Sequence, residues 1–311
     1  MSSSSGGSVF DVVHRAARSD PAVVFIGSDI APGLLSDMKR ELPDQFFMEG
    51  IQEQHLIGMA AGLALEGLRP VVSTIATFLT RRCFEQVLID AGLHRLPITL
   101  LGTGPGLAYA ALGPTHCSVD DFALMRAVPG MHVLSPSCMG EANLLLEESL
   151  ARRYLAYLRV PRGNEASLPA GSGSAAIGVP ITLRQGSDAV IICTGGLAGE
   201  AGAAAARLAI DSIDAGVVHV HTVKPLSPAS LLPLIAGVRL VVTIEEHLRS
   251  GGLGTAILEM LADARSEMPA VMRLGLPDEF VAGYGTHEQA LTAAGLTAEG
   301  IANAVRGWCQ R

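Results

Sequence analysis

Short apolar runs alternate with longer segments of helical character along the first half of the chain. The strands predicted there lie at residues 22–26, 46–48, 71–75, 98–102, 132–135 and 155–160. The helices predicted between them lie at residues 35–41, 53–65, 84–91, 122–127 and 140–150. Strands that are almost entirely hydrophobic and are separated by helices indicate a parallel sheet covered on both faces.

A stretch rich in Gly, Ser and Pro interrupts this pattern after residue 163, and such a composition is typical of a linker. The pattern then resumes, with strands predicted at residues 189–194, 217–222, 240–245 and 271–274 and helices at 199–210, 229–235, 254–264 and 297–308. We therefore predict an α/β protein with two doubly wound domains, each built on a mostly parallel sheet. The larger domain covers residues 9–163 and the smaller 181–311, with a disordered lead-in at 1–8 and a linker at 164–180.

The composition restricts the class of protein. Hydrophobic residues make up 49% of the chain and charged residues 17%, which suits large buried cores and not disorder. The net charge is −8 and Lys and Arg do not cluster, so we expect no nucleic-acid partner. The five cysteines are scattered singly, which argues against structural zinc and fits a reducing compartment. The sequence shows neither a signal-peptide pattern nor a membrane-spanning run, so we expect a cytoplasmic protein.

Glu53 stands between a predicted strand and a Gly/Ala-rich predicted helix. Helix N-termini carry positive potential and unpaired N–H groups, so an acid is stable there. One interpretation is therefore a first-turn acid that helps to start the helix. The other is a functional carboxylate, and the position alone leaves both open.

Three segments on the C-terminal side of predicted strands are further candidates for a ligand-binding or turn role. Gly102-Thr-Gly-Pro105-Gly resembles a phosphate loop, but it matches neither nucleotide motif in full, and Pro105 removes an N–H donor. Gly195-Gly196 fits a tight turn that leads into a helix. His116 closes Gly113-Pro-Thr-His116, on the side where open α/β sheets bind ligands. It is either a histidine that hydrogen-bonds its own loop or a general acid/base or oxyanion donor.

Two further pairs admit both a structural and a functional interpretation. Phe78 and Arg81 are three residues apart, so on a helix they share a face and could stack on a flat ring, although a Phe after a strand is often core. Arg159 and Arg162 end a predicted strand, where they are either surface charge or anion ligands.

Taken together, the chain from about residue 26 onward resembles the C-terminal part of the transketolase family, including the 1-deoxyxylulose-phosphate synthases. Four segments carry the resemblance, in the same order along the chain: Gly50-Ile-Gln-Glu53-Gln-His55, Ser73 to Arg81, Gly113-Pro-Thr-His116, and Arg159-Val-Pro-Arg-Gly. Val223-Lys-Pro-Leu226 and Gly275-Leu-Pro-Asp278 resemble that family's terminal domain.

The resemblance implies thiamine diphosphate as cofactor. It implies that Glu53 hydrogen-bonds the aminopyrimidine ring nitrogen and favours the tautomer that removes the thiazolium proton. It also implies that Phe78 stacks on the aminopyrimidine with Arg81 nearby, that His116 faces the reacting carbonyl, and that His55 and Arg159 lie toward the substrate. A carbanion formed on the cofactor would then attack a ketose or a 2-oxo acid.

Family enzymes hold the diphosphate and Mg²⁺ through a Gly-Asp-Gly…Asn motif in an N-terminal domain, and no Gly-Asp-Gly occurs in these 311 residues. We therefore expect a split enzyme in which a partner subunit holds the diphosphate and Mg²⁺. The expected assembly is a dimer of heterodimers with its active site between chains.

The chain also departs from the family pattern. Leu112 stands where the family usually has an Asp that reads an acceptor hydroxyl, Gly104 where a ligand-contacting polar residue is common, and Cys117 where Gln is usual. We expect an acceptor that is not an ordinary aldose phosphate, such as a less hydroxylated molecule or a carrier-bound lipoyl or acyl group.

The leading prediction is a two-component transketolase-like enzyme that transfers a two-carbon ketol unit from a ketose donor. One alternative is a decarboxylating enzyme that uses a 2-oxo acid, as the deoxyxylulose-phosphate synthases and the beta subunits of 2-oxo-acid dehydrogenases do. Another is a non-catalytic scaffolding subunit that kept the fold.

Overall fold

A computed structural model describes residues 7–29, 33, 35–162, 175–264 and 269–310. Most of the predicted lead-in at 1–8 and of the predicted linker at 164–180 lies outside these residues. None of the described helices is both long and apolar enough to cross a bilayer.

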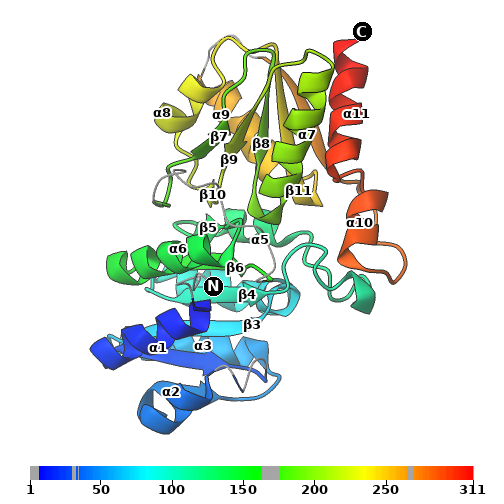
Figure 1. Cartoon of the computed structure of the whole chain (residues 1–311). Coiled ribbons are helices and arrows are strands. Elements are labelled where there is room, and N and C mark those ends of the chain that lie inside the picture. Colours follow the sequence, from blue (N-terminus) through cyan, green and yellow to red (C-terminus); the bar gives the residue numbers. More distant parts are fainter. Residues whose placement is uncertain (1–6, 30–32, 34, 163–174, 265–268, 311) are drawn as a thin grey trace, which may run out of the picture.

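The first half of the chain builds most of a seven-stranded sheet, drawn in the lower part of Figure 1. Its strand order is β10 (Thr222–Lys224), β5 (His132–Leu134), β6 (Ala156–Val160), β4 (Thr99–Thr103), β3 (Arg69–Ile75), β1 (Val23–Gly27) and β2 (Phe46–Met48). All pairs are parallel except that of β10 with β5. The carboxyl ends of the parallel strands therefore meet at one edge, where open α/β sheets place their ligands.

Helices cover both faces of this sheet, as expected for parallel strands whose side chains are apolar on both sides. One face carries α3 (Glu53–Leu65), the helical segment from Phe78 to Leu93 that contains α4 (Phe84–Gln86), and α5 (Asp121–Ala127). The other carries α1 (Val9–Ser19), α2 (Ser36–Glu41) and α6 (Met139–Arg152). This arrangement confirms the predicted α/β fold.

Helix α1 was not among the predicted elements. Its buried positions are Val9, Phe10, Val12, Val13 and Ala17, which is the spacing of one helix face. Ser8 begins it, and the Ser8 backbone N–H donates to Asp11 Oδ2 at 2.6 Å. The run of serines and glycines before it conceals this start signal.

The second half forms a five-stranded sheet. Its order is β12 (Ala270–Leu276), β11 (Leu240–Leu248), β8 (Ala189–Cys193), β9 (Ala215–His219) and β7 (Ile181–Arg184), with β7 antiparallel. Helices α7 (Ala198–Ile210) and α11 (Ala298–Cys309) pack against each other on one face, and α10 (His287–Ala293) precedes α11, as Figure 1 shows. Helices α8 (Pro228–Leu231) and α9 (Leu253–Ala264) cover the other face. The short elements β7, β10 and α10 were not predicted.

Strand β10 connects the two halves, because it follows β9 in the sequence but pairs with β5 of the first sheet. The Lys224 ammonium donates to the carbonyls of Arg126 and Val128 at 2.7 and 2.6 Å. A buried pair reinforces the junction, since His219 Nε2 lies 2.9 Å from Glu141 Oε2. The two sheets therefore share hydrogen bonds as well as apolar packing.

Candidate active site

Glu53 is the first residue of α3 and its side chain is only 1% exposed. Arg82 Nη1 donates to Glu53 Oε2 at 2.6 Å. The second carboxylate oxygen, Oε1, is buried and has no hydrogen-bond partner among the described residues. A buried carboxylate oxygen without a donor is costly, so this atom is ready to accept a hydrogen bond from a ligand.

Arg82 also links the Glu53 carboxylate to Phe78, because its guanidinium contacts both. The Arg82 guanidinium carbon is 4.3 Å from the centre of the Phe78 ring, a cation–π distance. The Phe78 ring also contacts the His116 imidazole edge to face, with centroids 5.2 Å apart and an interplanar angle of 71°. Successive contacts therefore connect Glu53 to Arg82, Arg82 to Phe78, and Phe78 to His116.

The sequence placed Arg81 on the same helix face as Phe78, whereas in the structure Arg82 lies against the Phe78 ring. Residues Phe78–Arg82 form a π-helical turn, whose wider spacing brings residues four apart onto one face. Arg81 instead makes a forked ion pair with Asp120, at 2.9 and 2.8 Å to its two carboxylate oxygens. Its Nη2 also donates to the Cys117 carbonyl at 2.9 Å. Arg81 therefore holds the loop that carries His116.

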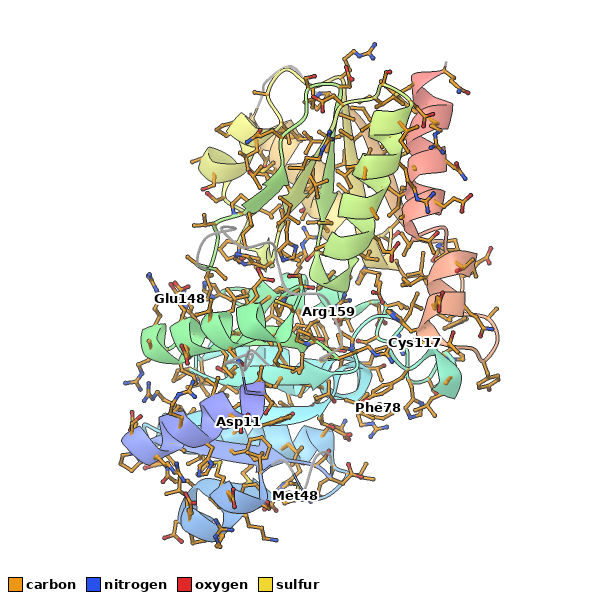
Figure 2. The ribbon with its side chains drawn as sticks, in the orientation of Figure 1. Asp11, Met48, Phe78, Cys117, Glu148 and Arg159 are labelled. Atoms are coloured by element: carbon orange, nitrogen blue, oxygen red, sulfur yellow. The ribbon has the colours of Figure 1, made fainter. Side chains whose placement is uncertain are left out.

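His116 is half-buried on this loop and its Nδ1 lies 3.0 Å from Thr115 Oγ1. The loop turns at Gly113, where φ is +78° and a Cβ would come within 2.5 Å of the Tyr284 ring. Figure 2 shows Phe78 and Cys117, the neighbour of His116, on the same side of the molecule. The two loops that follow β3 and β4 thus bring Phe78 and His116 together.

The other two candidates lie elsewhere. His55 is two residues into α3 from Glu53, with 52% of its side chain exposed and Nε2 3.8 Å from Glu49 Oε2. Arg159, at 5% exposed, is bound to Asp121: its Nε donates to Oδ2 at 2.8 Å, and its guanidinium lies 3.6 Å from the Phe122 ring centre. The structure thus brings together Glu53, Phe78 and His116, and leaves His55 at the surface.

Burial opposes the charge of Asp121, but the adjacent Arg159 guanidinium outweighs it and keeps the pKa of Asp121 below its ordinary value. Burial likewise opposes the charge of Arg159, but the Asp121 carboxylate raises the pKa of Arg159. Tyr157 donates its hydroxyl to Asp121 Oδ2 at 2.6 Å. This buried triad joins the start of α5 to β6.

Sequence reasoning missed Arg82 and Asp121. The signal for Arg82 is its position four residues after Phe78, because residues four apart also share a face of an ordinary helix.

Comparisons with known proteins identify the family of the chain. The family model for the transketolase pyrimidine-binding domain matches residues 7–166, and that for the transketolase C-terminal domain matches residues 179–301. The 1-deoxy-D-xylulose-5-phosphate synthase of Syntrophotalea carbinolica is 40% identical over 94% of this chain and 46% of its own length. That of Synechococcus sp. WH7803 is 37% identical over 96% of this chain and 46% of its own. The chain spans about half the length of these curated relatives.

Solved structures give the same result. A split-gene transketolase, described as an inactive beta4 tetramer, superposes with a TM-score of 0.85 at 28% identity and covers 96% of this chain and 95% of its own. A Pichia stipitis transketolase in complex with sedoheptulose 7-phosphate has a TM-score of 0.79 at 20% identity, over 97% of this chain and 46% of its own, and shows the fold alone. The chain belongs to the transketolase family, whose enzymes use thiamine diphosphate with a divalent metal.

Proposed function

We propose that this chain supplies the pyrimidine-binding half of a thiamine diphosphate site in a two-component transketolase-like enzyme. The observation that carries the proposal is Glu53 Oε1, a buried carboxylate oxygen that lacks a donor among the described residues. A protonated ring nitrogen of the aminopyrimidine is the donor that this atom would accept. Thiamine diphosphate, when bound, supplies a nucleophilic carbon and an electron sink for breaking and forming carbon–carbon bonds.

The roles of the chain's own residues follow from their contacts. Arg82 fixes the Glu53 carboxylate through Oε2, so that Oε1 keeps one direction. Phe78 offers an aromatic surface next to Glu53, and His116, whose ring contacts that of Phe78, would act as a general acid or base toward the reacting carbonyl. Arg81 positions His116 by holding the Cys117 carbonyl and Asp120.

A partner chain would hold the diphosphate and Mg²⁺, in a dimer of heterodimers. The sequence has no Gly-Asp-Gly motif. Among the described residues there is also no group of three or more His, Cys, Asp or Glu side chains that could hold a metal ion. The likeness to a split-gene transketolase whose beta4 tetramer is inactive supports a two-chain enzyme.

The proposed reaction moves a two-carbon ketol unit from a ketose phosphate to an acceptor poor in hydroxyl groups, small or carrier-bound. Leu112 supports this acceptor, because its side chain is 51% exposed only four residues before His116. An apolar residue there leaves an acceptor hydroxyl without the carboxylate that the family resemblance expects.

A second candidate is favoured by the relatives, which are 1-deoxy-D-xylulose-5-phosphate synthases at 37–40% identity. In this candidate the donor is a 2-oxo acid that loses carbon dioxide. Assays of the reconstituted pair with a ketose phosphate or with pyruvate separate the two. Ketol transfer without carbon dioxide supports the first, whereas carbon dioxide release from pyruvate at a higher kcat/KM replaces it with the second. If neither donor reacts, the scaffolding alternative stands.

A further inference from the structure

The loop that carries His116, residues 105–119, follows β4 of the first sheet but packs against the second half of the chain. Its buried apolar side chains belong to the core of that half, and they are Leu107, Ala110, Cys117 and Val119. The backbone is attached as well, because the Leu248 N–H of β11 donates to the Val119 carbonyl at 2.8 Å. The position of His116 therefore depends on the second half as well as on the sheet that bears Glu53 and Phe78.

A short bridge closes the base of this loop. The Gly106 N–H donates to the Ser118 carbonyl at 3.0 Å, and the Ser118 N–H donates to the Gly106 carbonyl at 2.9 Å. His116 is two residues before Ser118. Its place is therefore tied to that of Gly106, on the opposite side of the bridge.

Glu246, on β11, binds the base of the loop. Its side chain is 12% exposed, and its Oε2 accepts a hydrogen bond from the Leu107 N–H at 3.1 Å. Gly106 has a φ of +61°, and a Cβ there would come within 2.7 Å of the same oxygen. The left-handed backbone and the close approach of Glu246 both require glycine at this position. Glu246 therefore contacts the loop at the point where the bridge closes it.

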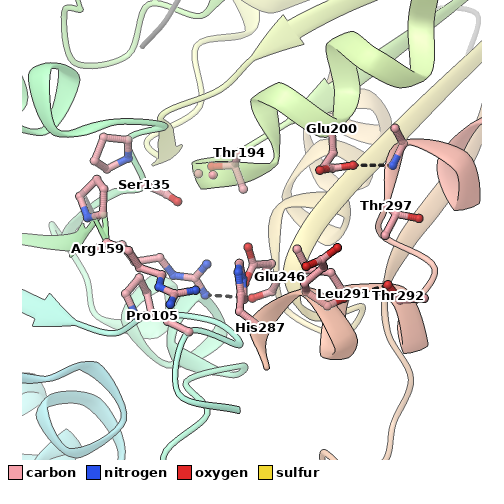
Figure 3. Close-up of a pocket in the computed structure, with 18 of the residues that line it drawn as sticks. Pro105, Ser135, Arg159, Thr194, Glu200, Glu246, His287, Leu291, Thr292 and Thr297 are labelled. Carbon is pink, nitrogen blue, oxygen red and sulfur yellow. Dashed lines mark hydrogen bonds and ion pairs between the residues drawn. The ribbon is translucent and has the colours of Figure 1, made fainter. Parts of the chain in front are cut away.

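His287, the first residue of α10, fixes the direction of this carboxylate. Its Nε2 lies 2.9 Å from Glu246 Oε2, and because an ionised carboxylate only accepts, Nε2 bears the hydrogen. Figure 3 shows the two side chains next to one another. Burial opposes the charge of Glu246, but the hydrogen bond from His287 keeps the pKa of Glu246 below its ordinary value. Glu246 therefore presents a charged and oriented acceptor to the loop, and such hydrogen bonds are stronger than those between neutral groups.

From these contacts we propose that Glu246 is a positioning residue for His116, and that His287 orients Glu246 for this role. Glu246 holds the start of the loop, and the bridge at its base carries the constraint to His116, whose ring lies against Phe78. The second half of the chain thus fixes a group of the site that the first half bears. The effect on turnover rests on the proposed function, whereas the placement of the His116 ring does not.

Substitutions of Glu246 separate positioning from a general loss of structure. Glu246→Ala removes the acceptor of the Leu107 N–H, whereas Glu246→Gln keeps an oxygen that can accept it. Asp188→Ala is the matched control, because Asp188 Oδ2 also accepts a backbone N–H of the second half, from Asp214 at 2.8 Å, but at the amino ends of β8 and β9. His287→Ala removes the orienting hydrogen bond at a partly exposed residue, and it replaces Glu246→Ala where that chain does not fold.

The first readout needs neither cofactor nor partner. In the full native chain the Phe78 and His116 rings, whose centroids are 5.2 Å apart, should show a nuclear Overhauser effect between their protons. We expect this effect to be lost in Glu246→Ala and retained in Glu246→Gln and Asp188→Ala. Its absence from the native chain, its retention in Glu246→Ala or its loss in Asp188→Ala would each overturn the proposal.

The second readout is turnover by the reconstituted complex. Because a catalytic group misplaced by about 1 Å can cost as much as about 100-fold in rate, we expect kcat of Glu246→Ala to fall roughly 10- to 100-fold with KM near the native value. Glu246→Gln should recover most of this loss, and Asp188→Ala should match the native kcat. A native kcat in Glu246→Ala, a change in KM alone or a Glu246→Gln variant without recovery would overturn the proposal. An inactive native complex contradicts the proposed function instead, and the contact between the Phe78 and His116 rings then decides the positioning role by itself.

Discussion

Arg82 binds one oxygen of the Glu53 carboxylate at 2.6 Å and leaves the other oxygen buried without a donor among the described residues. This relationship fixes the orientation of the Glu53 carboxylate. An acid that only starts a helix accepts from the N–H groups of its own first turn, whereas Glu53 accepts from Arg82 of the π-helical turn with one oxygen and has no donor for the other among the described residues. We therefore treat this pair as the basis of the proposed function.

The first prediction concerns Glu53 itself. Glu53→Gln keeps the shape of the side chain but turns one carboxylate oxygen into an N–H₂ donor, so it cannot hold a protonated ring nitrogen in the same way. We expect turnover of the reconstituted complex to fall by about 100-fold or more. Glu66→Gln is the control, because Glu66 is exposed just beyond the other end of α3 and should leave turnover unchanged. Unchanged turnover in Glu53→Gln would favour the scaffolding alternative.

Arg81 and Arg82 should respond differently to substitution. Arg82→Ala removes the donor to Glu53, so we expect both weaker cofactor binding, measured by titration, and lower kcat. Arg81→Ala releases Asp120 and the Cys117 carbonyl, so we expect a lower kcat with cofactor affinity near the native value. The opposite pattern would show that Arg81 is the cofactor-side arginine that the sequence first suggested.

Arg159 should act mainly as a structural residue. Arg159→Ala leaves the fully buried Asp121 carboxylate without its counter-charge, and we expect a loss of about 3–5 kcal/mol in the free energy of unfolding. Arg152→Gln, at an exposed pair with Glu148, should lose less than about 1 kcal/mol. Urea unfolding measures both values. A stable Arg159→Ala protein with a raised KM would restore the substrate-binding role expected from the sequence.

The junction between the halves should show a pH dependence. Burial opposes the charge of His219, but the Glu141 carboxylate raises the pKa of His219 to about 10. Between the ordinary histidine pKa of 6.5 and about 10, the folded chain keeps a proton that the unfolded chain releases. The stabilisation is therefore complete below pH 6.5 and is lost as pH rises toward 10. Urea unfolding from pH 6 upward should show this decline, and it should be smaller in His219→Asn.

His221 lies beside His219 but contributes in the opposite direction. Burial lowers the pKa of His221 to about 4, so its contribution to stability falls as pH drops from 6.5 to 4. A His221→Asn variant should keep the alkaline decline that His219→Asn reduces. Equal alkaline slopes in the native chain and in His219→Asn would contradict the assignment to His219.

The acceptor hypothesis depends on Leu112. Leu112→Asp would restore the carboxylate that the family resemblance expects, and we expect kcat/KM for an aldose phosphate acceptor to rise roughly 5- to 100-fold. Ala111→Asp, which adds the same charge one residue earlier, is the control. A native enzyme that already uses ribose 5-phosphate with ordinary transketolase efficiency would contradict the hypothesis.

The fold followed from the sequence because apolar runs such as 71–75 and 240–245 are long enough to identify buried parallel strands. The residues of β10 were harder to assign, because three residues gain strand geometry only by pairing with β5 across the junction. Helix α1 was concealed by the polar run before it. These elements depend on tertiary contacts or on a cap that periodicity does not reveal.

Within the site, the resemblance to the transketolase family indicated Glu53, Phe78 and His116, whereas their positions after predicted strands alone left structural interpretations open. From regular helix spacing, the sequence placed Arg81 on the same face as Phe78, whereas the structure has a π-helical turn here and Arg82 lies against the Phe78 ring. The pairing of Arg159 with Asp121 could not be inferred, since the two residues are 38 positions apart and meet only through the packing of α5 on the sheet.

The most direct test of the central claim is turnover during titration with a chain that carries the Gly-Asp-Gly…Asn motif. Thiamine diphosphate, Mg²⁺ and a ketose phosphate donor are present throughout. The account predicts that neither chain alone turns over substrate, that turnover rises to a plateau at equimolar chains, and that Glu53→Gln assembles equally well without turnover. Turnover by this chain alone, or full turnover by the Glu53→Gln complex, would contradict it.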